Sequence, residues 1–194
     1  MAYIATAYYT ENTGYEEEIQ HLKASLEHFD LPMDLVGIPT QGSWQANTQY
    51  KPYFIKQMLI RHYPKDILYL DADARVQQYP ALFDHVNFDL GVFYWKNKEL
   101  ISSTLYFANN AKVFELVERW ITCSFENADI WDQKVLQYVI QESKDLDLRI
   151  YMLPPTYCKI FDLMQEIENP VIEQFQASRR LKKEVDEPET EGKE

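Results

Sequence analysis

The chain has 194 residues, and its 19 Lys and Arg against 31 Asp and Glu give a net charge of −12. This length suits a single domain, and the acidic balance argues against nucleic acid as a partner, because phosphate backbones require clustered Lys and Arg. Two cysteines are too few for a disulfide framework, and no apolar run approaches the roughly 18 residues of a membrane span, so we expect a cytoplasmic protein without a membrane span.

The first predicted elements are a strand and a helix. Apolar, β-rich residues at 2–9 predict a buried strand. Thr13 and Glu16 then have the spacing of a capping box, in which the Thr13 hydroxyl accepts from the Glu16 amide. Apolar residues recur on one helical face behind this box, so we expect a helix to about His28.

The rest of the chain continues this alternation. The elements expected next are a strand at 33–38, a loop at 39–49, a helix at 52–63, strands at 67–70, 89–95 and 104–108, helices at 112–126 and 131–142, and a strand at 148–153. Strands that alternate with helical crossovers predict an α/β fold with a mostly parallel central sheet and helices on both faces.

The acidic charge is concentrated at the carboxyl end. Residues 184–194 hold six acidic residues and one lysine, which leaves about −7 for residues 1–183. Because the terminal segment has almost no apolar side chain to bury, we expect it to be disordered. We expect residues 1–183 to form the single folded domain.

One segment has the composition of a functional site. The apolar strand at 67–70 is followed directly by Asp71-Ala-Asp73, and ligands of open α/β sheets bind beyond the carboxyl ends of strands. Two carboxylates about 4 Å apart repel each other by about 4 kcal/mol at an effective dielectric constant of about 20. Such a pair suits Mg²⁺ or Mn²⁺ completed by substrate phosphates. The alternative is a solvated turn, because Asp-x-Asp triplets also occur by chance.

Other catalytic motifs are missing. The sequence has neither G-x-G-x-x-G nor G-x-x-x-x-G-K-[ST], which argues against a Rossmann dehydrogenase and a Walker-type NTPase. Its four histidines lack a metal-binding spacing such as H-E-x-x-H, which argues against a zinc hydrolase.

Several segments in the same order resemble glycosyltransferases of the GT-A fold, above all glycosyltransferase family 8 and related nucleotide-diphospho-sugar transferases. The matching segments are 51–52, 67–74, 80–83, 102–107, 131–133 and 170–180. The resemblance implies a single Rossmann-like GT-A domain. It also implies an enzyme that transfers a hexose from a nucleotide-diphosphate sugar, expected to be a UDP-sugar, in a metal-dependent reaction that retains the anomeric configuration.

The resemblance also implies roles for individual residues. Asp71 and Asp73 would bind Mn²⁺ (or Mg²⁺), with Gln174 in place of the family histidine that usually provides a third ligand. Asp132 and Gln133 would lie beside the anomeric carbon and the sugar hydroxyls. The remaining donor-binding positions are Ala7, Tyr8, Thr10, Tyr15, Lys51, Ser103, Arg179, Arg180 and Lys182.

Two departures from the family pattern bear on activity. Ser103 stands where the family has glycine, and its side chain would narrow the sugar pocket or change its specificity. Gln174 is a neutral, weaker ligand than histidine, and a small shift in the alignment would give the third position to Asp162 instead. A non-catalytic nucleotide-sugar-binding relative is therefore one alternative. A sugar nucleotidyltransferase is another, although residues 6–15 lack the glycine-rich basic loop that it needs.

Several of these residues also have plain structural interpretations. Lys51 and Asp132 can be solvated residues at helix starts, where an acidic side chain is favoured by the helix dipole. Tyr8 can be a packing residue, and Arg179 and Arg180 can belong to a basic surface. The acceptor, which can be a glycan, a protein, a lipid head group or a nucleobase, is not indicated by the sequence, because acceptor sites are built from variable loops.

Overall fold

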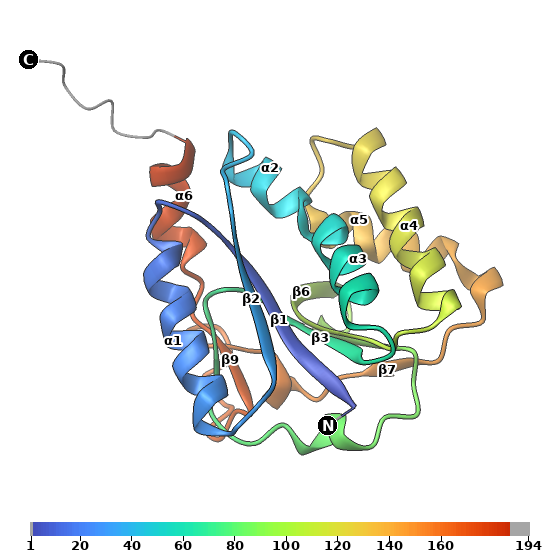
Figure 1. Cartoon of the computed structure of the whole chain (residues 1–194), viewed down its shortest axis with the longest axis horizontal. Coiled ribbons are helices and arrows are strands. Elements are labelled where there is room, and N and C mark those ends of the chain that lie inside the picture. Colours follow the sequence, from blue (N-terminus) through green and yellow to red (C-terminus); the bar gives the residue numbers. More distant parts are fainter. Residues whose placement is uncertain (1, 187–194) are drawn as a thin grey trace, which may run out of the picture.

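A six-stranded sheet lies at the centre of the computed structural model, which describes residues 2–186 and the side chains through Lys182 (Figure 1). Its strands, in spatial order, are β2 (Met33–Ile38), β1 (Tyr3–Thr10), β3 (Asp66–Leu70), β6 (Glu99–Phe107), β5 (Leu90–Trp95) and β7 (Ile150–Met152). β6 pairs antiparallel with β3 and β5, and the remaining pairs are parallel, so β6 runs against the other strands. The expected α/β fold with a mostly parallel sheet is confirmed.

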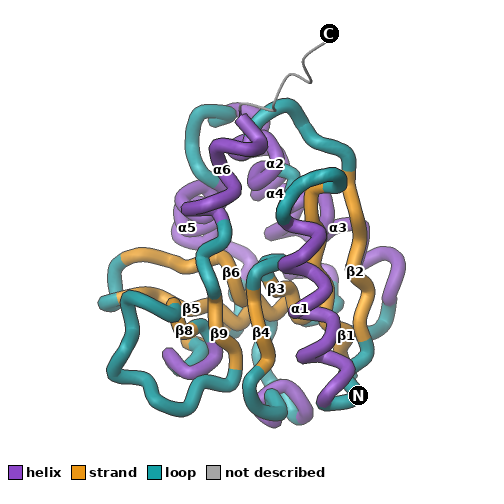
Figure 2. The backbone as a smooth tube through the Cα atoms, turned by 90° about the vertical axis from the view of Figure 1, so that its left-hand side faces the viewer, coloured by secondary structure: helices purple, strands orange, loops and turns teal. Residues whose placement is uncertain are grey.

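Both faces of this sheet are covered, but by different layers (Figures 1 and 2). Three helices, α3 (Lys51–His62), α4 (Ala111–Glu126) and α5 (Asp132–Glu142), form one apolar core with the first face. The other face packs against α1 (Tyr15–His28) and a small sheet of β4 (Ala74–Val76), β9 (Ile172–Gln174) and β8 (Lys159–Ile160). The remaining elements are α2 (Trp44–Gln49), α6 (Ser178–Asp186) and the 3₁₀ turns Ala81–Asp84, Lys144–Leu146 and Pro155–Tyr157.

β6 extends beyond the end of β3, and this overhang shapes the site described below. The last paired residue of β3, Leu70, lies opposite Thr104, so residues 99–103 continue past it. Side chains of α5 bind the backbone there: the amide oxygens of Gln137 and Gln133 accept from the N–H groups of Leu100 (3.0 Å) and Ser102 (3.4 Å). These bonds satisfy backbone groups that a neighbouring strand would otherwise satisfy.

The interpretation of residues 39–49 as a loop is wrong at its end, where α2 forms. Ser43 caps this helix, because its hydroxyl accepts from the Ala46 N–H at 3.1 Å. A six-residue helix is too short for an apolar stripe to repeat, so this segment has no periodic pattern that would mark a helix.

The first helix starts with a different arrangement of hydrogen bonds from the predicted capping box. The Thr13 hydroxyl accepts from the Tyr15 N–H at 3.3 Å, and the Glu16 N–H donates to the Thr13 carbonyl instead. The Glu16 carboxylate accepts from the Asn12 N–H at 2.9 Å. The Thr13 hydroxyl therefore binds the amide one position before the predicted one, and the Glu16 carboxylate satisfies a further amide near the helix start.

The carboxyl end is helical beyond the expected domain boundary. α6 runs to Asp186, so the boundary predicted between 183 and 184 falls within a helix, and residues 187–194 of the predicted tail lie outside the described residues. Across residues 2–186, no helix combines the length and apolar character needed to cross a bilayer.

Candidate active site

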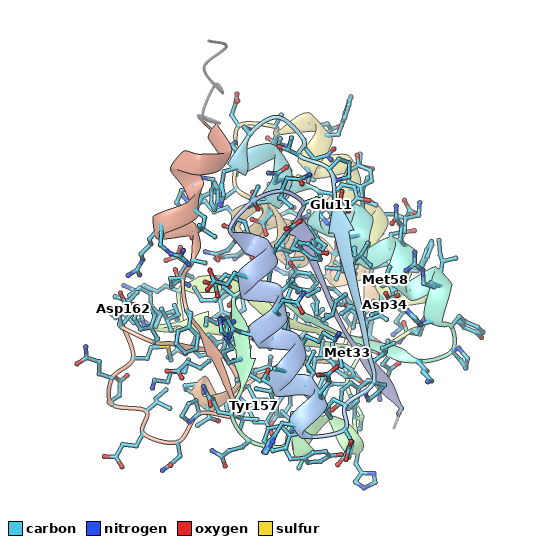
Figure 3. The ribbon with its side chains drawn as sticks, turned by 60° about the vertical axis from the view of Figure 1, so that its left-hand side comes forward. Glu11, Met33, Asp34, Met58, Tyr157 and Asp162 are labelled. Carbon is cyan, nitrogen blue, oxygen red and sulfur yellow. The ribbon has the colours of Figure 1, made fainter. Side chains whose placement is uncertain are left out.

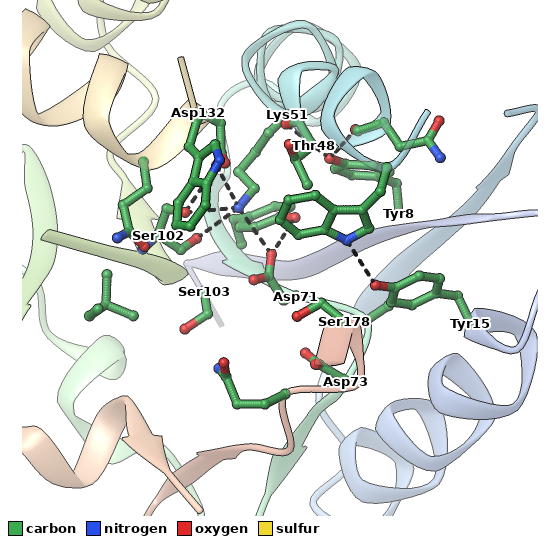
Figure 4. A pocket seen from close by; sticks show the side chains of 18 of the residues that line it. Tyr8, Tyr15, Thr48, Lys51, Asp71, Asp73, Ser102, Ser103, Asp132 and Ser178 are labelled. Carbon is green, nitrogen blue, oxygen red and sulfur yellow. Dashed lines mark hydrogen bonds and ion pairs between the residues drawn. The ribbon is translucent and has the colours of Figure 1, made fainter. Parts of the chain in front are cut away.

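A cavity of about 370 Å³ lies where Asp71-Ala-Asp73 leaves the carboxyl end of β3 (Figure 4). Its walls also include the end of β1, the overhang of β6 and the turn before α6. The lining residues are Tyr8, Tyr9, Thr10, Tyr15, Trp44, Asn47, Thr48, Lys51, Tyr69, Asp71, Ala72, Asp73, Trp95, Glu99, Ile101, Ser102, Ser103, Trp131, Asp132, Gln133, Ile160, Leu163, Gln176 and Ser178.

Lys51 joins three parts of the chain in the floor of this cavity. Its Nζ lies 2.9 Å from Asp132 Oδ2 and 3.1 Å from Asp71 Oδ1, and it donates to Ser102 Oγ at 3.0 Å (Figure 4). Burial alone would lower the pKa of the Lys51 ammonium, but the Asp132 and Asp71 carboxylates raise it above its usual value. Lys51 and Asp132 are buried ion-pair partners, which rules out the solvated interpretation of both.

The helices that carry these residues add to the electrostatics of the cavity. α3 begins at Lys51 with a proline in its first turn, and α5 begins at Asp132. Both amino-terminal ends therefore adjoin the cavity, and their backbone N–H groups and dipoles favour an anion. The cavity thus combines two helix ends that favour an anion with the carboxylates of Asp71, Asp73, Asp132 and Glu99, which repel one unless a cation is bound.

Asp71 and Asp73 are held by different partners. Asp71 Oδ1 also accepts from the Tyr69 hydroxyl at 2.8 Å, whereas Asp73 Oδ2 accepts from the Ala177 N–H at 2.6 Å. Burial, with the nearby charge of Asp71, raises the pKa of Asp73 to about 6. A divalent cation between these carboxylates would offset their repulsion.

Gln174 does not line the cavity. It is buried beneath the wall, where its Nε2 donates to Thr104 Oγ1 at 2.9 Å, and its Oε1 has no hydrogen-bond partner among the described residues. Gln176, two residues later, lines the cavity, with a left-handed φ of 54°. Asp162 lies in the loop after β8 and pairs with Arg179 (Figure 3). Gln176, rather than Gln174, therefore shares the cavity with the two carboxylates.

The side chains that the structure describes do not complete a metal site by themselves. Within the described part of the chain, no group of three or more His, Cys, Asp or Glu side chains could hold a metal ion. Asp71 and Asp73, with the Gln176 amide, offer hard oxygen ligands that suit Mn²⁺ or Mg²⁺ if a substrate supplies further oxygens.

Three of the residues expected near the nucleotide line the cavity, namely Tyr8, Thr10 and Tyr15. The Tyr8 hydroxyl donates to the Asn47 carbonyl at 2.8 Å and its ring packs against neighbouring aromatic rings, so Tyr8 is also a packing residue. Ala7 is buried in the core beneath α1 rather than in the cavity.

Ser103 lines the cavity as expected and lies over a buried thiol. Its Oγ is 3.4 Å from Cys158 Sγ, and burial raises the pKa of that thiol to about 11. The hydroxyl thus occupies space that a glycine would leave free, and the thiol beneath it stays protonated at neutral pH.

The basic residues of α6 are placed outside this cavity. Arg180 Nη2 lies 2.8 Å from Glu18 Oε1, and Arg179 pairs with Asp162. Both arginines line a second cavity of about 340 Å³ beside α1. The Lys182 ammonium lies 4.7 Å from the centroid of the Trp44 ring, which itself lines the first cavity.

The sequence interpretation missed most of the aromatic residues of the cavity. Trp44 and Trp131 meet edge to face with ring centroids 6.3 Å apart, and Trp95 lies in the wall near Glu99. Little in the sequence indicated that these tryptophans line a cavity. Trp131 is adjacent to the predicted site residue Asp132, whereas Trp44 was predicted in a loop and Trp95 in a strand.

By sequence, neither known family models nor curated proteins match the chain. By structure, it is similar to a glycosyltransferase involved in the glycosylation of the major capsid of PBCV-1, with a TM-score of 0.68 at 15% identity over 95% of this chain and 98% of that one. The glycosyltransferase GlyE of Streptococcus pneumoniae TIGR4 has a TM-score of 0.61 at 14% identity, over 90% of this chain and 55% of GlyE.

A third similar structure is the galactosyltransferase LgtC in complex with donor and acceptor sugar analogues, with a TM-score of 0.57 at 10% identity over 89% of this chain and 87% of LgtC. The fold is therefore that of the GT-A-like glycosyltransferases, as the sequence resemblance implied. At this level of identity the comparisons establish the fold, and the chain spans about half the length of GlyE and nearly the whole of the PBCV-1 protein.

Proposed function

We propose that the protein is a metal-dependent glycosyltransferase that takes a hexose from a UDP-sugar and retains its anomeric configuration. The observation that carries this proposal is the pair Asp71 and Asp73 in the wall of a cavity at the carboxyl end of β3. The fold, shared with glycosyltransferases, supports it. A carboxylate pair at this place suits a cation that in turn binds the diphosphate.

The residues of the cavity would have different roles in such a reaction. Asp71, Asp73 and the Gln176 amide would hold Mn²⁺ or Mg²⁺, and the cation would neutralise charge on the departing diphosphate. The amino-terminal ends of α3 and α5 would add further positive potential. Lys51 fixes the carboxylates of Asp71 and Asp132, which orients both groups toward a bound donor.

The sugar itself would lie against the start of α5. Asp132 and Gln133 are the polar residues there, and Ser102 and Ser103 form the adjoining part of β6. Tyr15 and Thr10 would line the base at the end of β1. Arg179 and Arg180 are bound to other carboxylates in this structure, so we do not assign the diphosphate to them.

A non-catalytic nucleotide-sugar-binding protein is a second candidate. It is favoured by one observation: the residue at the family's histidine position, Gln174, is buried below the cavity wall and donates to Thr104 rather than lining the cavity. Such a protein would bind a nucleotide without requiring the cation.

Thermal shift measurements separate the candidates. The protein is heated with UDP, UDP-glucose or UDP-galactose, with and without Mn²⁺, and donor hydrolysis is scored by mass spectrometry. The double variant Asp71→Asn/Asp73→Asn is compared with Asp30→Asn, an exposed carboxylate at the turn before β2. A Mn²⁺-dependent shift and hydrolysis that only the double variant loses would support the transferase. A cation-independent shift without hydrolysis would favour the binding protein, and no shift with any nucleotide would overturn both.

A further inference from the structure

A tryptophan and a glutamate stand side by side at one end of the cavity. The β5–β6 hairpin turns through Lys96 and Asn97, which have left-handed φ values of 51° and 56°. Trp95 and Glu99 are direct partners across this hairpin. Their side chains therefore stand on the same face of the sheet, with Cβ atoms about 5 Å apart, and both line the cavity.

Glu99 differs from the other carboxylates of the cavity because it lies outside the Lys51 cluster. Asp71 and Asp132 pair with Lys51, and Asp73 accepts from a backbone amide. Glu99 Oε1 accepts from Gln133 Nε2 at 3.0 Å. A carboxylate offers about four acceptor positions, so Glu99 can bind further hydroxyl donors without losing Gln133.

The pair is displaced along β6 from the place proposed for the donor sugar. Ser102 contacts both Lys51 and Asp132 at that place. Glu99 precedes Ser102 by three residues, which at about 3.3 Å per residue separates their backbones by about 10 Å. Gln133, which we place beside the donor sugar, also donates to Glu99, so the Trp95–Glu99 pair borders the donor site along β6.

The chemistry of the pair matches a sugar ring. An indole offers a flat apolar surface, which suits the C–H face of a pyranose, while Glu99 and the Gln133 amide suit the hydroxyls on its rim. Lys96 Nζ lies 4.5 Å from the centroid of the Trp95 ring. One cation and one carboxylate thus adjoin the indole, an arrangement that does not select a charged ligand. A protein tyrosine would present a single hydroxyl and leave the other polar groups of the site desolvated without partners.

We propose that Trp95 and Glu99 form the acceptor site and that the acceptor is an uncharged pyranoside. The inference rests on the proposed glycosyl transfer, in which the donor occupies the neighbouring part of the cavity. Glu99 is a specificity-determining residue in this proposal: it binds the acceptor and takes no part in holding the cation.

The test measures acceptor and donor binding separately. Methyl β-galactopyranoside, methyl β-glucopyranoside and lactose are titrated by saturation-transfer NMR, with and without UDP and Mn²⁺, against the wild type, Glu99→Gln and Trp95→Leu. Glu142→Gln, an exposed carboxylate at the end of α5, is the matched control. We expect both site variants to weaken glycoside binding about tenfold or more, which is about 1.4 kcal/mol. UDP binding, followed by thermal shift, should change less than about twofold.

The outcomes distinguish this inference from the proposed function. Glycoside binding that depends on Trp95 and Glu99 without nucleotide supports the acceptor site even if UDP fails to bind, which would overturn the donor proposal alone. No glycoside binding to a UDP-binding wild type, or equal binding to all variants, overturns the inference. Trp95-dependent binding of a tyrosine peptide in place of the glycosides also overturns it, because it assigns the site to a protein acceptor.

Discussion

Replacing Lys51 by methionine would leave two carboxylates in the floor of the cavity without their shared cation. In the wild type, Nζ lies 2.9 Å from Asp132 Oδ2 and 3.1 Å from Asp71 Oδ1. Methionine is close to lysine in shape and keeps the buried stem. The variant therefore tests the charge rather than the packing.

The size of the effect follows from the exposure of the two carboxylates. At about 3 Å and an effective dielectric constant of about 20, each pair is worth about 5 kcal/mol before the cost of desolvating the ions. The Asp71 side chain is 33% exposed and is screened by water, whereas that of Asp132 is 8% exposed. Truncating one member of a buried pair costs about 3–5 kcal/mol, and we expect Lys51→Met to lose that much free energy of unfolding.

Urea unfolding at neutral pH, followed by circular dichroism, measures this loss. Lys56→Met is the control: Lys56 pairs with Glu118 on the surface, with side chains 34% and 37% exposed, and should cost about 0–1 kcal/mol. Lys51→Met/Asp132→Asn removes the stranded charge and should be more stable than Lys51→Met alone. If Lys51→Met loses no more than Lys56→Met, or if the double variant is the less stable one, the reasoning fails.

Three further predictions follow from other parts of the structure. Hydrogen bonds from Arg149 lower the pKa of Asp89 to about 2. Because the unfolded pKa is about 3.9, the Asp89 carboxylate should contribute about 2 kcal/mol to the free energy of unfolding at neutral pH and lose this contribution as the pH falls toward 2. Urea unfolding of Asp89→Asn at the same pH values should not show this loss. Gln176→His should tighten Mn²⁺ binding about tenfold in calorimetry, and Gln174→His should leave it unchanged because that residue is buried away from the cavity. In Gly91→Ala, the new Cβ would lie 3.0 Å from the nearest Cβ across the sheet, and overpacking should cost about 1–3 kcal/mol, seen as a lower Tm.

The regular part of the fold was predictable because its signals are local. Apolar runs mark the central strands, and prolines mark both ends of α3. The small sheet has no such signal, since β4 and β9 are three-residue strands that pair residues 74–76 with residues 172–174. Pairing over that separation depends on tertiary packing, which neither segment encodes by itself.

Part of the candidate site was also predictable from local sequence signals, and part depends on contacts between distant segments. Lys51, Asp71 and Asp132 were each predicted and do meet, because each starts or follows a regular element whose end faces the cavity. The choice between Gln174 and Gln176 depends on how the chain leaves β9, including a left-handed residue that the sequence does not mark. The directions of the arginines on α6 depend on Glu18 and Asp162, which come from distant segments.

The contacts of α6 and the turn before it determine when the cavity can form during synthesis of the chain. Ala177 donates to Asp73, and Arg180 pairs with Glu18, which precedes it by 162 positions. A nascent chain emerges with its amino terminus first, so both carboxylates of the motif leave the ribosome well before the segment that covers them. The cavity can close only after residues 177–180 have emerged. A chain that stopped after β7 would keep every strand of the central sheet and still lack one wall of the cavity.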